Sequence, residues 1–220
     1  MRFMIEKSQA GAWLFLCRLL LVVCIAACNW GCTKPKVEVQ AIPAGVTVLV
    51  LGDSISYGAG AEHGTQDYPT LLASKTGWAV VNAGISGDVS SGGLSRLPSL
   101  LAQHRPRLVI IELGGNDFLR QMATARIEDN LRSMVHLVQQ ADAVAILIAM
   151  PEVSLAGRLH DHPLYARVAE ESGALLVSSA VSGVLSDDRL RADQVHPNAE
   201  GYRQLTDALV TQLRGLGVLR

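Results

Sequence analysis

The chain has 220 residues, of which 49% are hydrophobic, and its formal net charge is −1. This length is enough for one domain with a full hydrophobic core and too short for two comfortable ones. The nearly neutral charge gives no electrostatic basis for binding nucleic acid.

The first 27 residues have the pattern of a secretory signal peptide. Three basic residues precede or border the apolar run 19–27, which is too short to span a bilayer as a stable helix. The sequence Ile-Ala-Ala-Cys at 25–28 resembles the lipobox of bacterial lipoproteins, in which the cysteine becomes the lipid-modified first residue of the mature protein. We therefore expect residues 1–27 to be removed during export and Cys28 to be acylated.

The residue after Cys28 bears on where the protein is held. Asn29 stands in place of the aspartate associated with inner-membrane retention, so the lipobox resemblance favours the periplasmic side of the outer membrane. Several acyl chains on Cys28 would anchor the protein stably, as a single chain would not. The alternative is an ordinary cleaved signal and a soluble periplasmic protein, with Cys28 incidental.

The segment 28–45 is expected to be a lipidated tether, because it mixes Pro, Lys, Glu and Gln without a clear helix or strand pattern. All four cysteines lie at or before Cys32. The domain expected over 46–220 therefore contains neither a disulfide nor a thiolate metal site.

Strand-like and helical patterns alternate through this domain. The expected strands are Val46–Leu51, Trp78–Asn82, Leu108–Leu113, Ala143–Ala149 and Ala174–Val177. The expected helices are Tyr68–Thr76, Gly92–His104, Ile127–Gln140, Pro163–Ser172 and Ala199–Leu213. Alternation with short links predicts a three-layer α/β/α domain around a mostly parallel five-stranded sheet.

The first expected strand ends in Gly52-Asp53-Ser54, which places a hydroxyl group at the carboxyl edge of the sheet. Open α/β sheets bind their ligands at that edge, so Ser54 is a candidate nucleophile. Asp-Ser is also a common start of a helix, where the side chain only caps the backbone. Ser56 and Ser86 are competing hydroxyl groups, and both are more simply structural.

The next strands also end in small and polar residues, at 82–88 and 114–117, and Asp193 and His196 stand directly before the last helix. This set predicts an acyl-transfer site, in which His196 is the base for Ser54 and Asp193 fixes the tautomer of the ring. The backbone N–H groups of Ser54 and Gly84 and the side-chain amide of Asn116 are the candidate donors to an oxyanion.

These blocks resemble those of the GDSL-type, or SGNH, serine hydrolases. That family has a serine in Gly-Asp-Ser, a glycine after the second strand, an asparagine in Gly-x-Asn-Asp and a late Asp-x-x-His. The matches occur in the same order, within about 46–213, at Ser54, Gly84, Asn116, Asp193 and His196. Ile55 stands where the family name implies leucine, which leaves the nucleophile unaffected. The resemblance implies a flavodoxin-like fold, a triad of Ser54, His196 and Asp193, an oxyanion hole of Ser54, Gly84 and Asn116, and no cofactor.

The motifs 82–88 and 112–117 are similar to those of the bacterial thioesterase I, lysophospholipase and arylesterase branch of the family. This implies a hydrolase that cleaves carboxylic esters or thioesters of small molecules through an acyl-enzyme intermediate. One alternative is an O-acetyl esterase acting on carbohydrates or the cell wall, because the same fold hosts both. Another is an outer-membrane lipoprotein that only binds lipid or a partner, which gives no reason for the four polar motifs to coexist. We expect a monomer without nucleic acid.

Two features fall outside these motifs. His160-Asp161-His162 could suggest a metal, but adjacent residues on a loop rarely converge on one ion, so we expect none and place the segment at the rim of the substrate site. Glu112 is unusual because it lies late in a buried strand, and the sequence assigns it no role. The G-x-S-x-G elbow, the P-loop and the dinucleotide fingerprint do not occur in the sequence.

Overall fold

The computed structural model describes residues 40–153 and 159–220. The chain divides into Met1–Glu38 and Val39–Arg220, and the fold belongs to the second unit. The predicted signal peptide, the lipidated Cys28 and most of the predicted tether lie outside the described residues, so these predictions are not tested by the structure.

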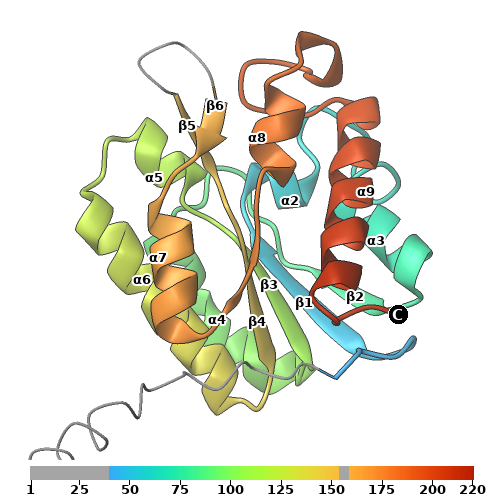
Figure 1. Ribbon diagram of the computed structural model, residues 1–220, viewed down its shortest axis with the longest axis vertical. Helices are drawn as coiled ribbons and strands as arrows, with labels where there is room; N and C mark the ends of the chain where they lie inside the picture. Colours follow the sequence, from blue (N-terminus) through green and yellow to red (C-terminus); the bar gives the residue numbers. More distant parts are fainter. Residues whose placement is uncertain (1–39, 154–158) are drawn as a thin grey trace, which may run out of the picture. The chain divides into compact units, whose positions relative to one another are not determined.

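A five-stranded parallel sheet forms the centre of this unit, which confirms the predicted fold class (Figure 1). Its strand order is β2-β1-β3-β4-β7, and every neighbouring pair is parallel. The strands are β1 (Thr47–Gly52), β2 (Ala79–Asn82), β3 (Leu108–Glu112), β4 (Val144–Ile148) and β7 (Leu175–Val177).

Helices cover both faces of the sheet (Figure 1). One face carries α3 (Tyr68–Thr76) and α9 (Ala199–Gly215), and the other carries α4 (Ser90–His104), α6 (Thr124–Gln140) and α7 (Leu164–Ser172). Three short helices lie near the carboxyl ends of the strands: α2 (Ser54–Tyr57), α5 (Gly115–Leu119) and α8 (Ala180–Leu185). A 3₁₀ turn, Asp188–Leu190, precedes the loop that leads into α9.

The helix boundaries follow from ordinary end signals. Asp67 caps α3 by accepting the N–H of Thr70 at 2.9 Å, Pro69 occupies the first turn, and Gly77 ends the helix with a φ of 71°. In α6, the buried residues recur every three or four positions, as a helix with one face on the core requires.

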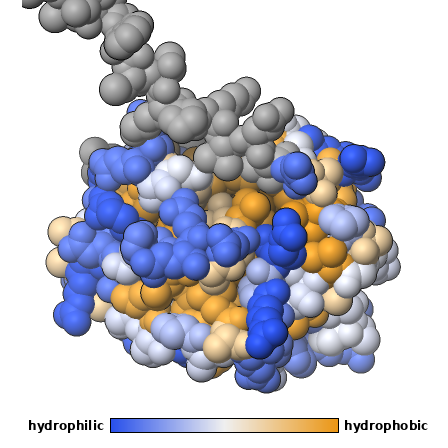
Figure 2. Space-filling view, turned by 90° about the horizontal axis from the view of Figure 1, so that it is seen from below, coloured by the Kyte–Doolittle hydropathy of each residue, from blue (hydrophilic) through white to orange (hydrophobic). Residues whose placement is uncertain are grey.

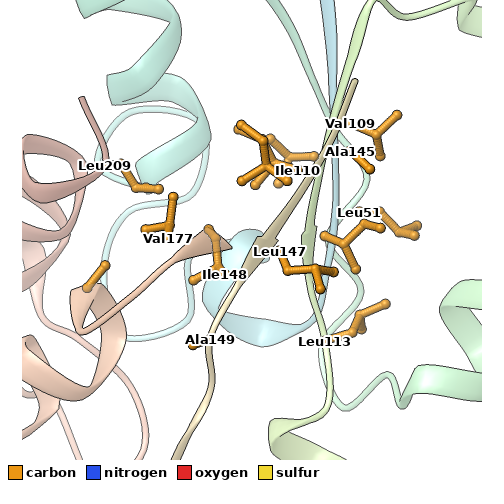
Figure 3. Packing of buried hydrophobic residues seen from close by; sticks show 14 of the residues in the cluster. Leu51, Val109, Ile110, Leu113, Ala145, Leu147, Ile148, Ala149, Val177 and Leu209 are labelled. Carbon is orange, nitrogen blue, oxygen red and sulfur yellow. The ribbon is translucent and has the colours of Figure 1, made fainter. Parts of the chain in front are cut away.

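The central strands are buried on both faces, so their residues form continuous apolar runs rather than alternating patterns. Side chains one residue apart point to opposite sides: Val109 and Ala145 lie on one side of the sheet, and Ile110 lies on the other (Figure 3). Val177 and Ile148 lie near Leu209 of α9, which closes this side of the core (Figure 3).

The strand order places a switch point between β1 and β3. The chain leaves β1 toward β2 on one side and returns to β3 on the other, so the loops after β1 and β3 diverge and leave a crevice. Ser54 directly follows β1, and Asn116 lies in the loop and short helix after β3. The topology therefore brings these two predicted site residues to the same crevice.

Some elements were not predicted. An antiparallel hairpin of β5 (Pro151–Val153) and β6 (Leu159–Asp161) rises beyond the carboxyl end of β4 (Figure 1). The hairpin strands, Pro-Glu-Val and Leu-His-Asp, contain no continuous apolar run, and α5 and α8 are too short to show a helical period.

The opposite end of the domain, at the amino ends of the strands, shows hydrophilic residues interspersed with apolar ones (Figure 2). Among the described residues, no helix is both long and apolar enough to cross a membrane.

Candidate active site

Ser54 occupies the first position of α2, directly after β1. The chain turns sharply there because Gly52 has no side chain: a Cβ at this position would lie 1.9 Å from Ser56 Oγ. Asp53 caps the helix, and its Oδ1 accepts the N–H of Ile55 at 3.0 Å. The competing hydroxyl group of Ser56 is buried and donates to Glu112 Oε2 at 2.7 Å, so it faces away from the surface.

The structure brings His196 and Asp193 to Ser54. His196 Nε2 lies 2.9 Å from Ser54 Oγ, and His196 Nδ1 lies 2.8 Å from Asp193 Oδ2. Hydrogen bonds, first from the His196 ring and then from the N–H groups of Val195 and His196, hold the pKa of Asp193 below its ordinary value. An ionised Asp193 accepts the hydrogen on Nδ1, which leaves Nε2 as an acceptor for the Ser54 hydroxyl group.

Backbone contacts hold the loop that carries this histidine. Ala192 N–H donates to the His196 carbonyl at 2.9 Å, and Arg191 and Pro197 form an antiparallel bridge. Asn198 then caps α9 by accepting the N–H of Gly201 at 2.9 Å. The position of His196 is therefore set by a closed turn that is tied to the start of a long helix.

Asn116 reaches the same crevice from α5. Its Nδ2 donates to Asp53 Oδ2 at 2.9 Å and to the Asp88 carbonyl at 3.0 Å. The preceding Gly114 has a φ of 116°, and a Cβ there would lie 2.2 Å from the hydroxyl oxygen of Tyr165. That hydroxyl group donates to the Leu113 carbonyl at 2.7 Å, so α7 fixes the course of the loop.

Gly84 does not fit the oxyanion role that the sequence suggested for it. Its N–H donates to Asn82 Oδ1 at 2.9 Å, and a Cβ at Gly84 would lie 2.4 Å from the backbone nitrogen of Tyr57. Gly84 is instead a site of close packing beneath α2. The described part of the cavity wall includes Gly87 and not Gly84.

Gly87 is the better-placed glycine. It has a φ of 78° and belongs to a turn closed by the Asp88 N–H, which donates to the Ile85 carbonyl at 3.0 Å. No acceptor among the described residues receives the Gly87 N–H, and Gly87 lines the same cavity as Ser54 and Asn116. Both glycines stand in the segment 82–88, and sequence spacing alone did not distinguish them.

A buried carboxyl pair lies behind the nucleophile turn. Glu112 is fully buried, and its Oε2 accepts the N–H groups of Asp53 and Ser56 at 3.3 and 3.1 Å. Burial raises the pKa of Glu112 well above its ordinary value, and burial raises the pKa of Asp53 to about 6.

Arg96 of α4 joins the ends of the first two strands. Its guanidinium group donates to the Gly52 carbonyl at 2.9 Å, to the Ala83 carbonyl at 2.5 Å and to Asp88 Oδ2 at 2.9 Å. One side chain therefore links the turn before Ser54 with both ends of the loop that contains Gly87. This role could not be predicted from the sequence, because two of the three contacts are made to backbone carbonyl groups.

The crevice opens into a cavity of about 650 Å³. Ser54, Gly87, Asn116 and His196 line the cavity, and the rest of the wall is mostly apolar. The apolar lining is Ile55, Ala59, Phe118, Leu119, Met150, Pro151, Leu159, Leu185 and Val195. Leu119 remains 65% exposed at this wall, so the apolar lining continues to the surface. Cavities of this size and lining commonly hold small ligands.

The hairpin β5–β6 contributes to the wall through Glu152 and Leu159. Its two histidines lie against that glutamate: His160 Nε2 and His162 Nε2 lie 3.0 and 3.4 Å from its two carboxylate oxygens. The His162 ring also stacks on the ring of Phe118, with 4.6 Å between the two ring centroids. In the part of the chain that the structure describes, no group of three acidic, histidine or cysteine side chains is arranged to hold a metal ion.

Comparisons with known proteins agree with this geometry. Residues 50–204 match the GDSL-like Lipase/Acylhydrolase family. The chain is 37% identical to esterase TesA of Pseudomonas aeruginosa over 79% of this chain and 90% of the relative. It is 36% identical to thioesterase 1/protease 1/lysophospholipase L1 of Escherichia coli strain K12 over 77% of this chain and 84% of the relative. A crystal structure of TesA matches with a TM-score of 0.70 and 36% identity, over 77% of this chain and 99% of that one. The chain therefore belongs to the GDSL-like lipase/acylhydrolase family and is an ester or thioester hydrolase.

Proposed function

We propose that Ser54 is the nucleophile of this hydrolase and that His196 and Asp193 activate it. The observation that carries the proposal is the continuous chain of two contacts, Ser54 Oγ to His196 Nε2 at 2.9 Å and His196 Nδ1 to Asp193 Oδ2 at 2.8 Å. Ser54 Oγ attacks the carbonyl carbon of the substrate while Nε2 takes the hydroxyl proton. His196 then gives this proton to the leaving alcohol or thiol, and water repeats the sequence on the acyl-enzyme.

The oxyanion formed in each attack needs donors on the side opposite His196. The candidates are the N–H groups of Ser54 and Gly87 and the Nδ2 of Asn116, because all three residues line the cavity. Asn116 can serve if its amide exchanges the Asp88 carbonyl for the oxyanion while its bond to Asp53 keeps it in place. The N–H of Gly87 has no acceptor among the described residues, so it can donate to the oxyanion without giving up another hydrogen bond.

The substrate that fits the cavity is an ester or thioester with an apolar acyl chain longer than acetyl. Nine of the lining residues are apolar, and they include Pro151 and Leu159 of the hairpin β5–β6. An acetyl group would leave most of this wall in contact with water. We do not favour the O-acetyl esterase alternative for this reason.

We also propose that the enzyme is exported and held at the periplasmic side of the outer membrane by acylated Cys28. The support is the lipobox-like sequence 25–28 and the signal-like residues before it. Replacing Cys28 by Ser should abolish palmitate incorporation and partitioning into detergent. Palmitate that persists in the variant would contradict the proposal.

The proposed function is tested by hydrolysis of p-nitrophenyl esters from acetate to palmitate, with Ser54→Ala as the inactive control. Each methylene group buried in the cavity should raise kcat/KM by at most about fourfold, until the apolar wall is covered. A maximum at acetate would contradict the acyl-chain assignment, and residual activity in Ser54→Ala would contradict the nucleophile.

A further inference from the structure

Glu112 has an unusual arrangement of donors for a buried acid. Three donors converge on Oε2: the N–H groups of Asp53 and Ser56 and the Ser56 hydroxyl group, the last at 2.7 Å. Tyr68, whose hydroxyl oxygen lies 2.8 Å from Ser56 Oγ, extends this chain of hydrogen bonds. Oε1 is buried as well and has no partner among the described residues. A buried acceptor without a donor is costly, so the lone oxygen needs an explanation.

The neighbour of Glu112 is another acid. Asp53 and Glu112 lie close together, since the Asp53 N–H donates to Glu112 Oε2 at 3.3 Å, and the side chains of both are almost completely buried. Two neighbouring carboxyl groups in a buried site do not both ionise readily, because like charges repel and burial removes hydration. Among the described residues, no Lys, Arg or His forms an ion pair with either carboxyl group, and the guanidinium group of Arg96 pairs with Asp88 instead. One proton must therefore remain on the pair.

The hydrogen bonds indicate which acid keeps that proton. Asp53 uses both oxygens as acceptors, Oδ1 for the Ile55 N–H and Oδ2 for the Asn116 amide. The Oε2 of Glu112 is also an acceptor, so the proton belongs on the unpartnered Oε1. We infer that Glu112 stays protonated, donates this proton to Asp53, and so acts as a positioning residue that leaves one negative charge on Asp53 beside Asn116.

The negative charge on Asp53 would affect the reaction through Asn116, and this step of the inference rests on the proposed function. A hydrogen bond from Asn116 to a carboxylate is stronger than one to a neutral acceptor, so it holds the amide in a single orientation. Asn116 can then give its second N–H to the oxyanion without losing its anchor. The ionisable groups that face the pair are Tyr68 of α3, Tyr165 of α7, Tyr202 of α9 and His196 of the loop before α9.

Infrared spectroscopy of the full-length protein tests the inference without any use of its activity. At neutral pH, the wild type should show the C=O stretching band of a buried protonated carboxylic acid. The difference spectrum should show this band lost in Glu112→Gln and retained in Asp53→Asn. A wild type without such a band, or a band that survives in Glu112→Gln, would overturn the inference. The wild-type spectrum can be read even if the Glu112 variant does not fold.

Steady-state kinetics on a p-nitrophenyl ester provides the second readout. Gln at position 112 keeps an acceptor for the three donors and an N–H donor for Asp53, so it mimics the protonated acid. Asp53→Asn removes the charge beside Asn116. We expect kcat in Asp53→Asn to be roughly 10- to 100-fold lower than in Glu112→Gln, with similar KM values. The opposite order of the two variants would place the charge on Glu112 and contradict the inference. If neither the wild type nor the variants hydrolyse esters, the proposed function fails while the infrared result stands.

Discussion

The carboxyl group of Asp193 decides which nitrogen of His196 faces the nucleophile. Because Oδ2 receives Nδ1–H at 2.8 Å, the other ring nitrogen is left without hydrogen and lies 2.9 Å from Ser54 Oγ. Both backbone bonds to Oδ1 hold the carboxylate in the orientation that this contact requires. At the scale of single residues, the site thus depends on where each hydrogen lies.

Replacing Asp193 by Asn should therefore lower kcat strongly while the protein remains folded. An amide at this position can donate to Nδ1, which would place the hydrogen on Nε2 and block proton transfer from Ser54. The loss reaches about 10⁴-fold in the serine proteases. The control is Asp188→Asn, since that side chain is exposed in the same region and does not contact His196. A kcat close to that of the control would show that Asp193 is only a turn residue.

Asn116→Ala separates a chemical role from a structural one. If Nδ2 donates to the oxyanion, kcat should fall by roughly 10²–10³, with KM little changed because the bound ester barely uses this donor. If Asn116 only links the loops through Asp53 and Asp88, the free energy of unfolding should fall by about 1 kcal/mol with kcat intact. Kinetics and a thermal melt of the same sample distinguish these results.

The sequence predicted the site residues that stand in polar motifs directly after a strand or before the last helix. Ser54, Asn116, Asp193 and His196 were all placed in the site in advance, and the structure brings them to one crevice. Gly84 was expected to donate to the oxyanion, whereas its N–H donates to Asn82 Oδ1, and a glycine carries no chemical signal that shows whether its N–H is free. Glu112 had no assigned role because its partners come from the backbone of a turn 56–59 residues away.

At the scale of secondary-structure elements, α4 links two loops of the site through one side chain. Its Arg96 is mostly buried and donates to carbonyl groups at the ends of both β1 and β2. The Ala83 carbonyl precedes the loop of Gly87, and the Gly52 carbonyl precedes the turn of Ser54. The positions of two proposed oxyanion donors therefore depend on one guanidinium group.

Arg96→Met should lower kcat by about 10- to 100-fold with KM largely kept, because the donors lose their relative positions while the cavity wall remains. Lys at position 96 can satisfy only part of this planar set of contacts, so it should restore activity partly. Arg126→Met is the matched control, since that side chain is exposed on α6. An Arg96→Met enzyme with normal kcat and a lower melting temperature would limit Arg96 to a structural role.

The elements themselves could be predicted where they are long. The helix Tyr68–Thr76 was predicted with its observed boundaries, and each end of the five strands was predicted to within one residue. Both depend on apolar periodicity or continuous burial over several residues. The hairpin β5–β6 forms one wall of the cavity, yet its three-residue strands were not predicted because their pairing depends on tertiary contacts.

Considered as a whole, the molecule places two buried acids against the end of a parallel sheet, and this affects its stability. The pKa of Asp53 is about 6 in the folded protein, because burial raises it from an ordinary value of 3.8. Between these values the folded state holds more protons than the unfolded chain. The free energy of unfolding should therefore fall as the pH rises through this window.

Chemical denaturation of the wild type and of Asp53→Asn from pH 4 to 7 measures this contribution. The difference between the two proteins removes the contributions of other groups, such as Asp193, whose pKa is lowered. The stability of the wild type relative to the variant should fall by up to about 3 kcal/mol between pH 4 and 6.5. A difference that is independent of pH, or that rises with it, would show that Asp53 ionises in the folded protein as it does in water.

The most direct test of the central claim is covalent labelling by a fluorophosphonate, which mimics the attacked carbonyl group and reacts only with an activated nucleophile. Mass spectrometry of the labelled wild type should show a single adduct, on the peptide that contains Ser54. His196→Ala should label far more slowly, and Ser54→Ala should not label. An adduct at Ser56 or Ser86, or labelling that persists in Ser54→Ala, would contradict the assignment of Ser54 as the nucleophile.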